Sequence, residues 1–595
     1  MKNLRLLLPY LRPYRASLLW GLVLVLVSSA LILYTPKLIG RGIDALARPG
    51  VDARTVFGYA ALSVAVTVVG GVARFGMRQI LNGVSRRVET DLRNDFFRHL
   101  LRLDAPFYGR TPTGEIMSLA TNDLSAVRMV AGPAIMYLVN MIVTALFALT
   151  LMVWISPRMT LFALIPMLAL PVITLGFAKV IHDRYERIQA EFGIMSSIAQ
   201  ENLAGARIVK AYGQEDAQSE RFRALSEKYM GRNMDLVRAS GLFQPLLGLF
   251  GGVATVVVLW LGGRAILDRQ ITVGEFVEFT MYLGMLSWPM ISLGWVVNLF
   301  QRGAASMGRV ARVLETVPSV RDPETPAAPA AVRGEIEFRN VSFRYPGTER
   351  WVLRGASFHV PAGATLAVVG PTGSGKSTLV ALLARLYDPT EGEVLIDGVP
   401  VSRWPLERLR ATIGVVPQDA FLFSATIREN LALGFDEPDP AREEERIRAA
   451  ARVAQLDETV GSFPNGYDTA LGERGINLSG GQKQRATLAR AIARDPALLV
   501  LDDALSAVDT HTETEILQGL RGVLEGRTSV IVSHRVTAVM NADRIVVLDD
   551  GKVAEVGTHA ELLRAGGVYA ALQRRQLLAD TLEGEPVLAP AEWGV

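Results

Sequence analysis

Cysteine is absent from this chain, and so is any strong excess of one charge. Without cysteine, the chain can form no disulfide and no thiolate metal site, and it cannot use a cysteine nucleophile. A formal net charge of only +3 over 595 residues gives no reason to expect nucleic acid as a partner. Glycine and proline are present in ordinary amounts, which excludes a low-complexity or fibrous chain.

Apolar residues, by contrast, are abundant. They make up 50% of the chain, and the mean hydropathy of +0.26 is too high for an ordinary soluble enzyme. Six apolar stretches in the N-terminal half approach or exceed the ~20 residues that a helix needs to cross hydrocarbon. They are residues 16–35, 56–72, 129–155, 159–178, 241–263 and 274–299. We therefore predict an α-helical transmembrane domain with six spans.

The first stretch could instead be a cleaved signal peptide, but it is longer than the ~7–15-residue core of such a peptide. Five spans would also place the two ends of the chain on opposite sides of the membrane. The N-terminal segment and the connections 74–128 and 179–238 hold 23 Lys and Arg residues, against 7 in the alternate connections. The positive-inside rule therefore predicts a cell-membrane protein whose two termini lie in the cytoplasm.

The two long basic connections carry apolar residues at helical spacing, over residues 82–104 and 185–224. We expect the membrane helices to continue there, well beyond the bilayer. A segment rich in Pro and Ala, residues 318–334, then separates the apolar half from alternating short strands and helices. The predicted strands include 336–343 and 365–369, and the latter is followed by a helix at 377–387. The predicted domains are 1–317 (transmembrane), 318–334 (linker), 335–580 (α/β, nucleotide-binding) and 581–595 (tail).

A glycine-rich loop stands between that strand and that helix. It matches the phosphate loop of nucleotide-binding proteins in its required context. Its residues are Gly370, Pro371, Thr372, Gly373, Ser374, Gly375, Lys376, Ser377 and Thr378. The glycines let backbone N–H groups surround phosphate oxygens, and the helix N-terminus favours negative charge. Lys376 would reach the β- and γ-phosphates, and Ser377 would ligate magnesium.

An apolar strand at residues 498–502 ends in the carboxylates of Asp502 and Asp503. A buried strand that delivers an aspartate to magnesium is the second element that P-loop nucleotide hydrolysis requires. Together with the phosphate loop, this strand predicts ATP and Mg²⁺ as cofactors of an α/β P-loop domain.

Between these two motifs lies the run Leu478-Ser479-Gly480-Gly481-Gln482. With it, the chain resembles the ATP-binding cassette (ABC) transporters over essentially its whole length, as a half-transporter of the exporter type. The resemblance implies ATP-driven export by alternating access and an α/β cassette that pairs head to tail with another. Ser479, Gly480, Gly481 and Gln482 would then bind nucleotide held by the second cassette.

The same resemblance implies roles for three further residues. Tyr345 would stack on adenine, Gln418 would contact magnesium and the attacking water, and His534 would contact the γ-phosphate. Residues 506–509 match the D-loop, and residues 472–475 match the exporter segment that contacts the cytoplasmic loops. Short helices at 111–119 and 211–216 are the expected docking elements of those loops.

The transported solute is less clearly indicated. Ionisable residues are expected along ion pathways, and the apolar stretches offer only Glu275 and Glu278, placed near one interface. We therefore expect spans without buried charge and a hydrophobic or amphipathic substrate: a drug, a lipid or a peptide. One helical face of the sixth stretch suits either substrate binding or ordinary packing, with Met281, Met285, Trp288, Ser292 and Trp295. An importer or an ATP-gated channel on this architecture remains an alternative.

Asp503 departs from the pattern of the family, which places Glu directly after the magnesium aspartate. The aspartate side chain is one methylene shorter, which withdraws the carboxylate by ~1.5 Å. A general base must lie within hydrogen-bond reach of the water that it polarises. The signature at Ser479 is intact, so the chain would still complete a partner's site. We therefore expect a heterodimer with a second half-transporter that supplies the Glu; a homodimer that tolerates Asp503 is the alternative.

These expectations predict a slow ATPase. When the chain is purified alone, Asp503→Glu should raise its rate of ATP hydrolysis by up to about 100-fold, because misplacement of a catalytic group by about 1 Å can cost that much. Phosphate release under saturating ATP measures the effect. Rapid hydrolysis by the unchanged chain that Asp503→Glu does not increase would rule out the idea that Asp503 limits this site.

Overall fold

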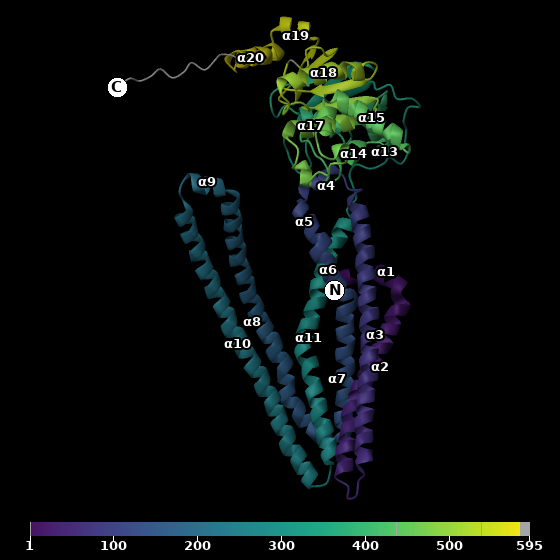
Figure 1. Cartoon of the computed structure of the whole chain (residues 1–595), viewed down its shortest axis with the longest axis vertical. Helices are drawn as coiled ribbons and strands as arrows, with labels where there is room; N and C mark the ends of the chain where they lie inside the picture. Colours follow the sequence, from purple (N-terminus) through teal and green to yellow (C-terminus); the bar gives the residue numbers. More distant parts are fainter. Residues whose placement is uncertain (1, 436, 537, 584–595) are drawn as a thin grey trace, which may run out of the picture. The chain divides into compact units, whose positions relative to one another are not determined.

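The computed structural model describes residues 2–435, 437–536 and 538–583, so the expected tail 581–595 lies outside the described residues from 584 onward. The described chain forms two compact units (Figure 1). Unit 1 comprises the residues up to Leu101 together with Pro112–Thr316. Unit 2 comprises Arg102–Thr111 and the described residues from Val317 onward. The chain therefore passes between the two units three times.

Unit 1 is helical, and its described residues include six helices that are long and apolar enough to cross a membrane, as predicted. Its long helices are α2 (Arg15–Leu46), α3 (Ala53–Leu100), α7 (Ile135–Ile155), α8 (Pro157–Ala204), α10 (Glu215–Leu267) and α11 (Val273–Leu314). Short elements precede α2 and α7: η1 (Lys2–Leu7), α1 (Leu8–Leu11) and η2 (Arg12–Tyr14), then α5 (Thr113–Ser118), η3 (Leu119–Asp123), α6 (Leu124–Met129) and η4 (Val130–Ala134).

The predicted continuation of the membrane helices into the long connections is confirmed for α3 and α8, which run without a break to Leu100 and Ala204. The second connection is nevertheless interrupted. Gly205 ends α8, and Gly213 adopts φ +59°, in the left-handed region that favours glycine. Between them lies the short helix α9 (Ala206–Ala211), so the expected docking helix at 211–216 is misplaced by about one turn.

The other expected short helix, at 111–119, is present as α5, and the sequence interpretation missed a second short helix before it, α4 (Ala105–Arg110). Helix α4 belongs to unit 2, whereas α5 belongs to unit 1. The Asp104 side chain caps α4 by accepting from the Phe107 N–H at 3.4 Å, and Pro106 stands in the first turn. Both are helix-start signals that the sequence carried.

Asp104 also joins α4 to the chain that follows α11. Its carboxylate accepts hydrogen bonds from the N–H and hydroxyl of Ser319, both at 2.5 Å, and from the N–H of Val320 at 3.0 Å. Burial alone would raise the pKa of Asp104, but the bonds from Ser319, Val320 and Phe107 hold that pKa below its usual range. The carboxylate is therefore ionised at neutral pH and keeps accepting these hydrogen bonds.

Helices α2 and α11 approach each other at glycines. A Cβ on Gly274 would stand 2.1 Å from the backbone oxygen of Gly40, so only glycine allows this approach. Asp44 of α2 accepts from the N–H of Gly274 and from the hydroxyl of Thr272, each at 2.7 Å, at the start of α11. Contact and cap together fix the register of the two helices.

The expectation that the spans bury no charged group is wrong at Glu278. This residue lies in the second turn of α11 and is only 7% exposed. The Tyr282 hydroxyl lies 3.1 Å from its carboxylate and 2.9 Å from the backbone oxygen of Leu33. A polar partner on the same helix, one turn away, is what allows the carboxyl group to be enclosed between α2 and α11.

Unit 2 contains two sheets within the described residues. The first is antiparallel, in the order β2-β1-β4-β5, with β1 (Ile336–Phe343), β2 (Leu353–Val360), β4 (Glu391–Ile396) and β5 (Val399–Pro400). The second has the order β10-β9-β3-β8-β7-β6, with β3 (Thr365–Val369), β6 (Ile413–Val416), β7 (Leu498–Asp502), β8 (Thr528–Val532), β9 (Arg544–Asp549) and β10 (Lys552–Gly557). All neighbours in the second sheet are parallel except β9 and β10.

Strands β3 and β7 of the second sheet are buried apolar runs. Such runs are typical of parallel sheets that helices cover on both faces. The α-helices of unit 2 that follow β3 are α12 (Lys376–Leu383), α13 (Leu406–Thr412), α14 (Ile427–Ala432), α15 (Pro440–Val453), α16 (Asp457–Gly461), α17 (Gly480–Ala493), α18 (Thr510–Leu524), α19 (His559–Ala565) and α20 (Val568–Glu583). Helix α12 ends four residues before the predicted boundary, because Arg385 adopts a left-handed φ of +47°. The predicted order of a six-helix domain followed by an α/β domain is confirmed.

The glycine contact between α2 and α11 leads to a stability prediction. Gly274→Ala should lower the free energy of unfolding by about 1–3 kcal/mol, because the added methyl group forces backbone apart. Gly284→Ala, on the same helix with open space around its Cβ, is the matched control and should have no such effect. Thermal unfolding of the detergent-solubilised protein, followed by tryptophan fluorescence, measures both. Equal melting temperatures for the two variants would contradict the prediction.

Candidate nucleotide site

The phosphate loop leaves the carboxyl end of β3 and enters α12 through glycines that no other residue could replace. Gly370, Gly373 and Gly375 adopt φ values of +152°, +82° and +102°. A Cβ on Gly370 would stand 2.1 Å from the backbone oxygen of Leu548, and one on Gly375 would stand 2.9 Å from that of Val352. The loop therefore holds a curled backbone whose N–H groups can face an anion.

The interior of the loop suits phosphate. The hydroxyl of Ser374 is buried and has no hydrogen-bond partner among the described residues, so a donor stands ready there. The ammonium group of Lys376 donates to the backbone oxygens of Gly370 and Pro371, at 2.8 and 2.9 Å. Burial lowers the pKa of Lys376, while the charges of Asp503 and Asp502 oppose that shift. The lysine is thus folded back over the loop, within reach of a bound phosphate chain.

Two oxygen ligands meet where β7 ends. Asp502 is the last residue of that strand and is 6% exposed, and its carboxylate accepts a hydrogen bond from the Ser377 hydroxyl. Burial raises the pKa of Asp502, and the charge of Asp503 adds to this, while Ser377 and Lys376 oppose it. A hydroxyl and a carboxylate side by side are hard oxygen donors of the kind that Mg²⁺ binds together with phosphate. These residues fit the expected ion.

Asp503 stands directly beyond the strand in a left-handed conformation, with φ +50°. Its N–H donates to the backbone oxygen of Val532 at 2.9 Å, which fixes the turn. Its carboxylate lies 3.0 Å from Nδ1 of His534, whose side chain is 57% exposed while that of Asp503 is 14% exposed. The two side chains predicted to act at the γ-phosphate are therefore already paired with each other.

A single cavity of about 230 Å³ collects most of the predicted residues. It is lined by Val352, Thr372, Gly373, Gly375, Lys376, Ser377, Thr378, Gln418, Asp502, Asp503, Val532, Ser533 and His534. Gln418, which follows β6, thus lies with the phosphate loop, as the resemblance implied. The cavity brings together an ammonium group, a hydroxyl, two carboxylates, an amide and an imidazole, a set suited to binding and hydrolysing a nucleotide.

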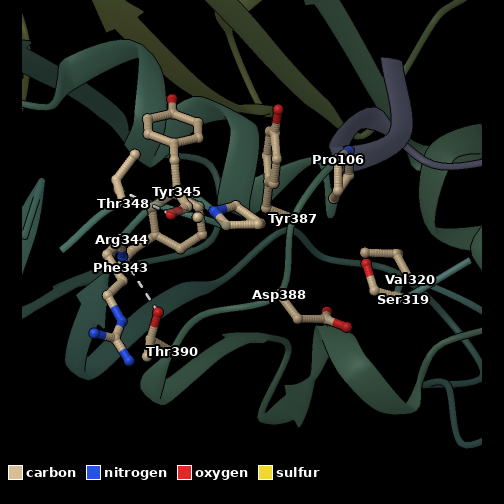
Figure 2. Close-up of a pocket in the computed structure, with 12 residues that line it drawn as sticks. Pro106, Ser319, Val320, Phe343, Arg344, Tyr345, Thr348, Tyr387, Asp388 and Thr390 are labelled. Atoms are coloured by element: carbon tan, nitrogen blue, oxygen red, sulfur yellow. Dashed lines mark hydrogen bonds between the residues drawn. The ribbon is translucent and has the colours of Figure 1, made fainter. Parts of the chain in front are cut away.

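Tyr345 is not among the residues that line this cavity. It borders a neighbouring cavity of about 510 Å³ together with Tyr387, Phe343 and Pro106 of α4 (Figure 2). Its hydroxyl lies 3.0 Å from that of Thr378, and its ring stands edge-on to that of Tyr387, with ring centroids 5.3 Å apart. The aromatic residue expected to stack on adenine therefore forms part of the wall between the phosphate loop and the α4 cavity.

The signature residues also lie outside the nucleotide cavity. Ser479 caps α17, accepting from the Gln482 N–H at 3.3 Å, and the Gln482 side chain accepts from the Ser479 N–H at 2.9 Å. Gly480 and Gly481 occupy the first turn of that helix, so backbone donors are presented at its N-terminus. No residue of the signature contributes to the cavity as it stands in one described chain.

Sequence reasoning missed two features of this site. It missed α4 and Asp104, although a helix-capping aspartate followed by proline was a usable signal. It also missed Gln484, a buried residue just after the signature that hydrogen-bonds to the D-loop. No local pattern of the sequence identified that contact.

Two family models match the chain. Residues 18–290 match the ABC transporter transmembrane region, and residues 353–506 match the ABC transporter model. Among curated proteins, the chain is 37% identical over 95% of its length to a Bacillus subtilis protein described as a probable multidrug resistance ABC transporter ATP-binding/permease protein, of which the match covers 96%.

Two further relatives show the same full-length similarity. The Escherichia coli multidrug resistance-like ATP-binding protein MdlA is 35% identical, with 97% of both chains covered, and the ATP-dependent lipid A-core flippase of Burkholderia orbicola is 35% identical, with 97% of this chain and 96% of the flippase covered. The structure of a bacterial Atm1-family ABC exporter with ATP bound superimposes with a TM-score of 0.78 at 31% identity, covering 94% of this chain and 99% of that one.

The position of Tyr345 leads to a binding prediction. Tyr345→Ala should weaken ATP binding by about tenfold, because stacking of a base on an aromatic ring contributes about 1–3 kcal/mol. Tyr345→Phe keeps the ring, loses only the contact with Thr378, and should stay within about threefold of the unchanged protein. Titration with a fluorescent ATP analogue measures both. Equally weakened binding by the Phe and Ala variants would show that the hydroxyl, and not the ring, matters.

Proposed function

Since this chain belongs to the ABC transporter family and is a multi-pass membrane protein, we propose that it is the slow-site half of an ATP-driven exporter of hydrophobic or amphipathic solutes. The observation that carries the proposal is the nucleotide cavity, in which Lys376, Asp502 and His534 meet. The described residues of the same chain include six helices long and apolar enough to cross a membrane. Relatives of the same length bear names that refer to multidrug resistance and lipid A, which supports an apolar cargo.

Most of the polar groups of the cavity have a definite task in this proposal. The phosphate-loop backbone and the ammonium group of Lys376 bind and orient the phosphates. Ser377, Asp502 and Gln418 would hold Mg²⁺, which supplies neutralisation of the charge on the phosphates. His534 lies where it can donate to the γ-phosphate, and Asp503 lies where it can orient water. The roles of Gln418 and His534 are those that the family resemblance implies, and the shared cavity supports all of these assignments.

The signature needs a second subunit in order to act. Ser479 and the first turn of α17 present donors, yet they line no part of the chain's own nucleotide cavity. In the proposed assembly, they close over the nucleotide held by the partner, and the partner's signature closes over Lys376. Nucleotide then holds the cassettes together, and hydrolysis releases them, which shifts the membrane helices between their two arrangements.

Asp503 is the reason for proposing two different subunits. Its carboxylate is held 3.0 Å from His534, and its short side chain and left-handed backbone restrict how far it can extend toward a water molecule. A partner with Glu at the equivalent position would complete one efficient site, formed by its own phosphate loop and this chain's signature. A homodimer that tolerates Asp503 is the alternative. The Asp503→Glu experiment distinguishes the two possibilities, because such a homodimer would already hydrolyse ATP rapidly and would gain nothing from the change.

Helix α4 is the element through which we propose that the cassette and the membrane helices are coupled. It lies in unit 2 beside Tyr387 and is tied by Asp104 to Ser319 and Val320. Tyr345 separates this cavity from the phosphate loop, so a base that stacks on Tyr345 would press on the same wall. In this way, nucleotide binding can change the position of α4.

The proposed cargo surface is aromatic. Trp288 and Trp295 of α11 are 63% and 44% exposed in the described chain, and Trp295 stands edge-on to Tyr137 with ring centroids 4.8 Å apart. Ser292, expected on the same face, is buried instead, so the predicted stripe is only partly available to a solute. Large, partly exposed rings suit flat apolar molecules.

A transport assay tests the function. Vesicles whose cassettes face outward, and which contain this chain together with its partner, should take up a lipophilic fluorescent dye when Mg-ATP is added. Lys376→Ala, combined with the same change at the phosphate-loop lysine of the partner, should abolish the uptake, because the phosphate chain loses its cation. Loss of preloaded dye on ATP addition would instead indicate import. No ATP-dependent movement of dye or fluorescent phospholipid in either direction would contradict the proposed function.

A further inference from the structure

Gln484 is a buried polar residue that none of the roles described so far requires. It is the fifth residue of α17, five positions after Ser479, and it is only 5% exposed. Its side-chain amide donates to the hydroxyl of Ser506 at 2.9 Å and accepts from the N–H of Ala507 at 2.8 Å. Because the Ala507 N–H can only donate, the orientation of the amide is fixed. Both ends of the side chain are therefore bound to the D-loop, residues 506–509.

The backbone of the D-loop also lies against the start of α17. A Cβ on Gly481 would stand 2.9 Å from the backbone oxygen of Ala507, and one on Gly480 would stand 3.6 Å from the Ala507 side chain. Side chains larger than glycine at 481 would therefore push the loop away. The first turn of the signature helix and the D-loop form one packed unit, and Gln484 supplies its side-chain hydrogen bonds.

The other connections of the D-loop are backbone or local ones. The N–H of Ser506 donates to the backbone oxygen of Asp503 at a long 3.3 Å, and Asp509 caps α18 through the Thr512 N–H at 2.9 Å. The Ser506 side chain is otherwise exposed. The loop therefore has two short hydrogen bonds to the signature helix and one long hydrogen bond to Asp503 of its own subunit.

We propose that Gln484 is a positioning residue that fixes the D-loop relative to Ser479, so that both act together on the nucleotide bound by the partner subunit. This inference rests on the proposed two-subunit arrangement, in which Ser479 serves the partner's phosphates. The signature donors and the D-loop then approach that nucleotide as one rigid surface. Without the amide, the donors are still present, but the loop beside them is free to shift.

The first experiment uses the Asp503→Glu protein, in which two copies of this chain provide two efficient sites. Gln484→Met keeps the length of the side chain and removes both hydrogen bonds. It should lower kcat for ATP hydrolysis at least tenfold and leave KM within about threefold. Thr487→Val is the matched control: Thr487 is buried on the same helix, and its hydroxyl bonds only to the Gln484 backbone oxygen. That control should keep kcat within about twofold.

A second experiment identifies the site on which Gln484 acts. Dimers of two differently tagged copies carry Lys376→Ala in one copy, so that only the other phosphate loop functions. Gln484→Met should reduce kcat strongly when it is in the copy with Lys376→Ala, because that copy supplies the signature to the working loop. In the other copy, its effect should be at least fivefold smaller. Equal losses in both arrangements, or a larger loss in the second, would overturn the proposal.

Ser506→Ala tests the same inference if the Gln484→Met variant fails to fold. This residue is exposed, and its replacement removes only one of the two hydrogen bonds, so a smaller loss with the same dependence on the arrangement is expected. An unchanged kcat for Ser506→Ala together with an unfolded Gln484→Met would count against the inference. Absence of ATP hydrolysis in the Asp503→Glu dimer without further changes would instead count against the proposed function.

Discussion

The parallel register of β3, β8 and β7 is the constraint from which the chemistry of this chain follows. Val368 of β3 and Asp502 of β7 both pair with Val532 of β8. The three strands therefore end at the same level, and whatever follows them meets at one edge of the sheet. The phosphate loop follows β3, Asp503 follows β7 and His534 follows β8. A shift of one residue in either pairing would separate the ammonium group from the carboxylates.

The parts of the site that could be predicted from the sequence are those with a strong local signal. Strands β1 and β3 match their expected bounds, because apolar runs flanked by turns carry a strong local signal. The phosphate loop is local too, and its geometry is dictated by glycines. Tyr345 could be named from a resemblance, but its place in a wall beside α4 depends on Tyr387, 42 positions away, and on Thr378.

The failures have physical causes as well. The end of α12 was misplaced because the left-handed turn at Arg385 leaves no mark in the hydrophobic pattern. The short helix expected at 211–216 lies at Ala206–Ala211 instead, because the chain turns through the left-handed conformation of Gly213 where the expected helix would run. Glu278 was expected near an interface because its distance from the helix start was known, whereas its enclosure depends on Tyr282 and on α2.

Asp104, which the sequence interpretation missed, connects two segments of the chain that lie far apart in the sequence. Its carboxylate binds Ser319 and Val320, so the segment between α3 and α5 is fastened to the segment that leaves α11. The polypeptide enters unit 2 after Leu101 and again after Thr316, and Asp104 joins these two entering segments soon after each boundary. Neither segment can therefore separate from unit 2 without breaking hydrogen bonds to the other.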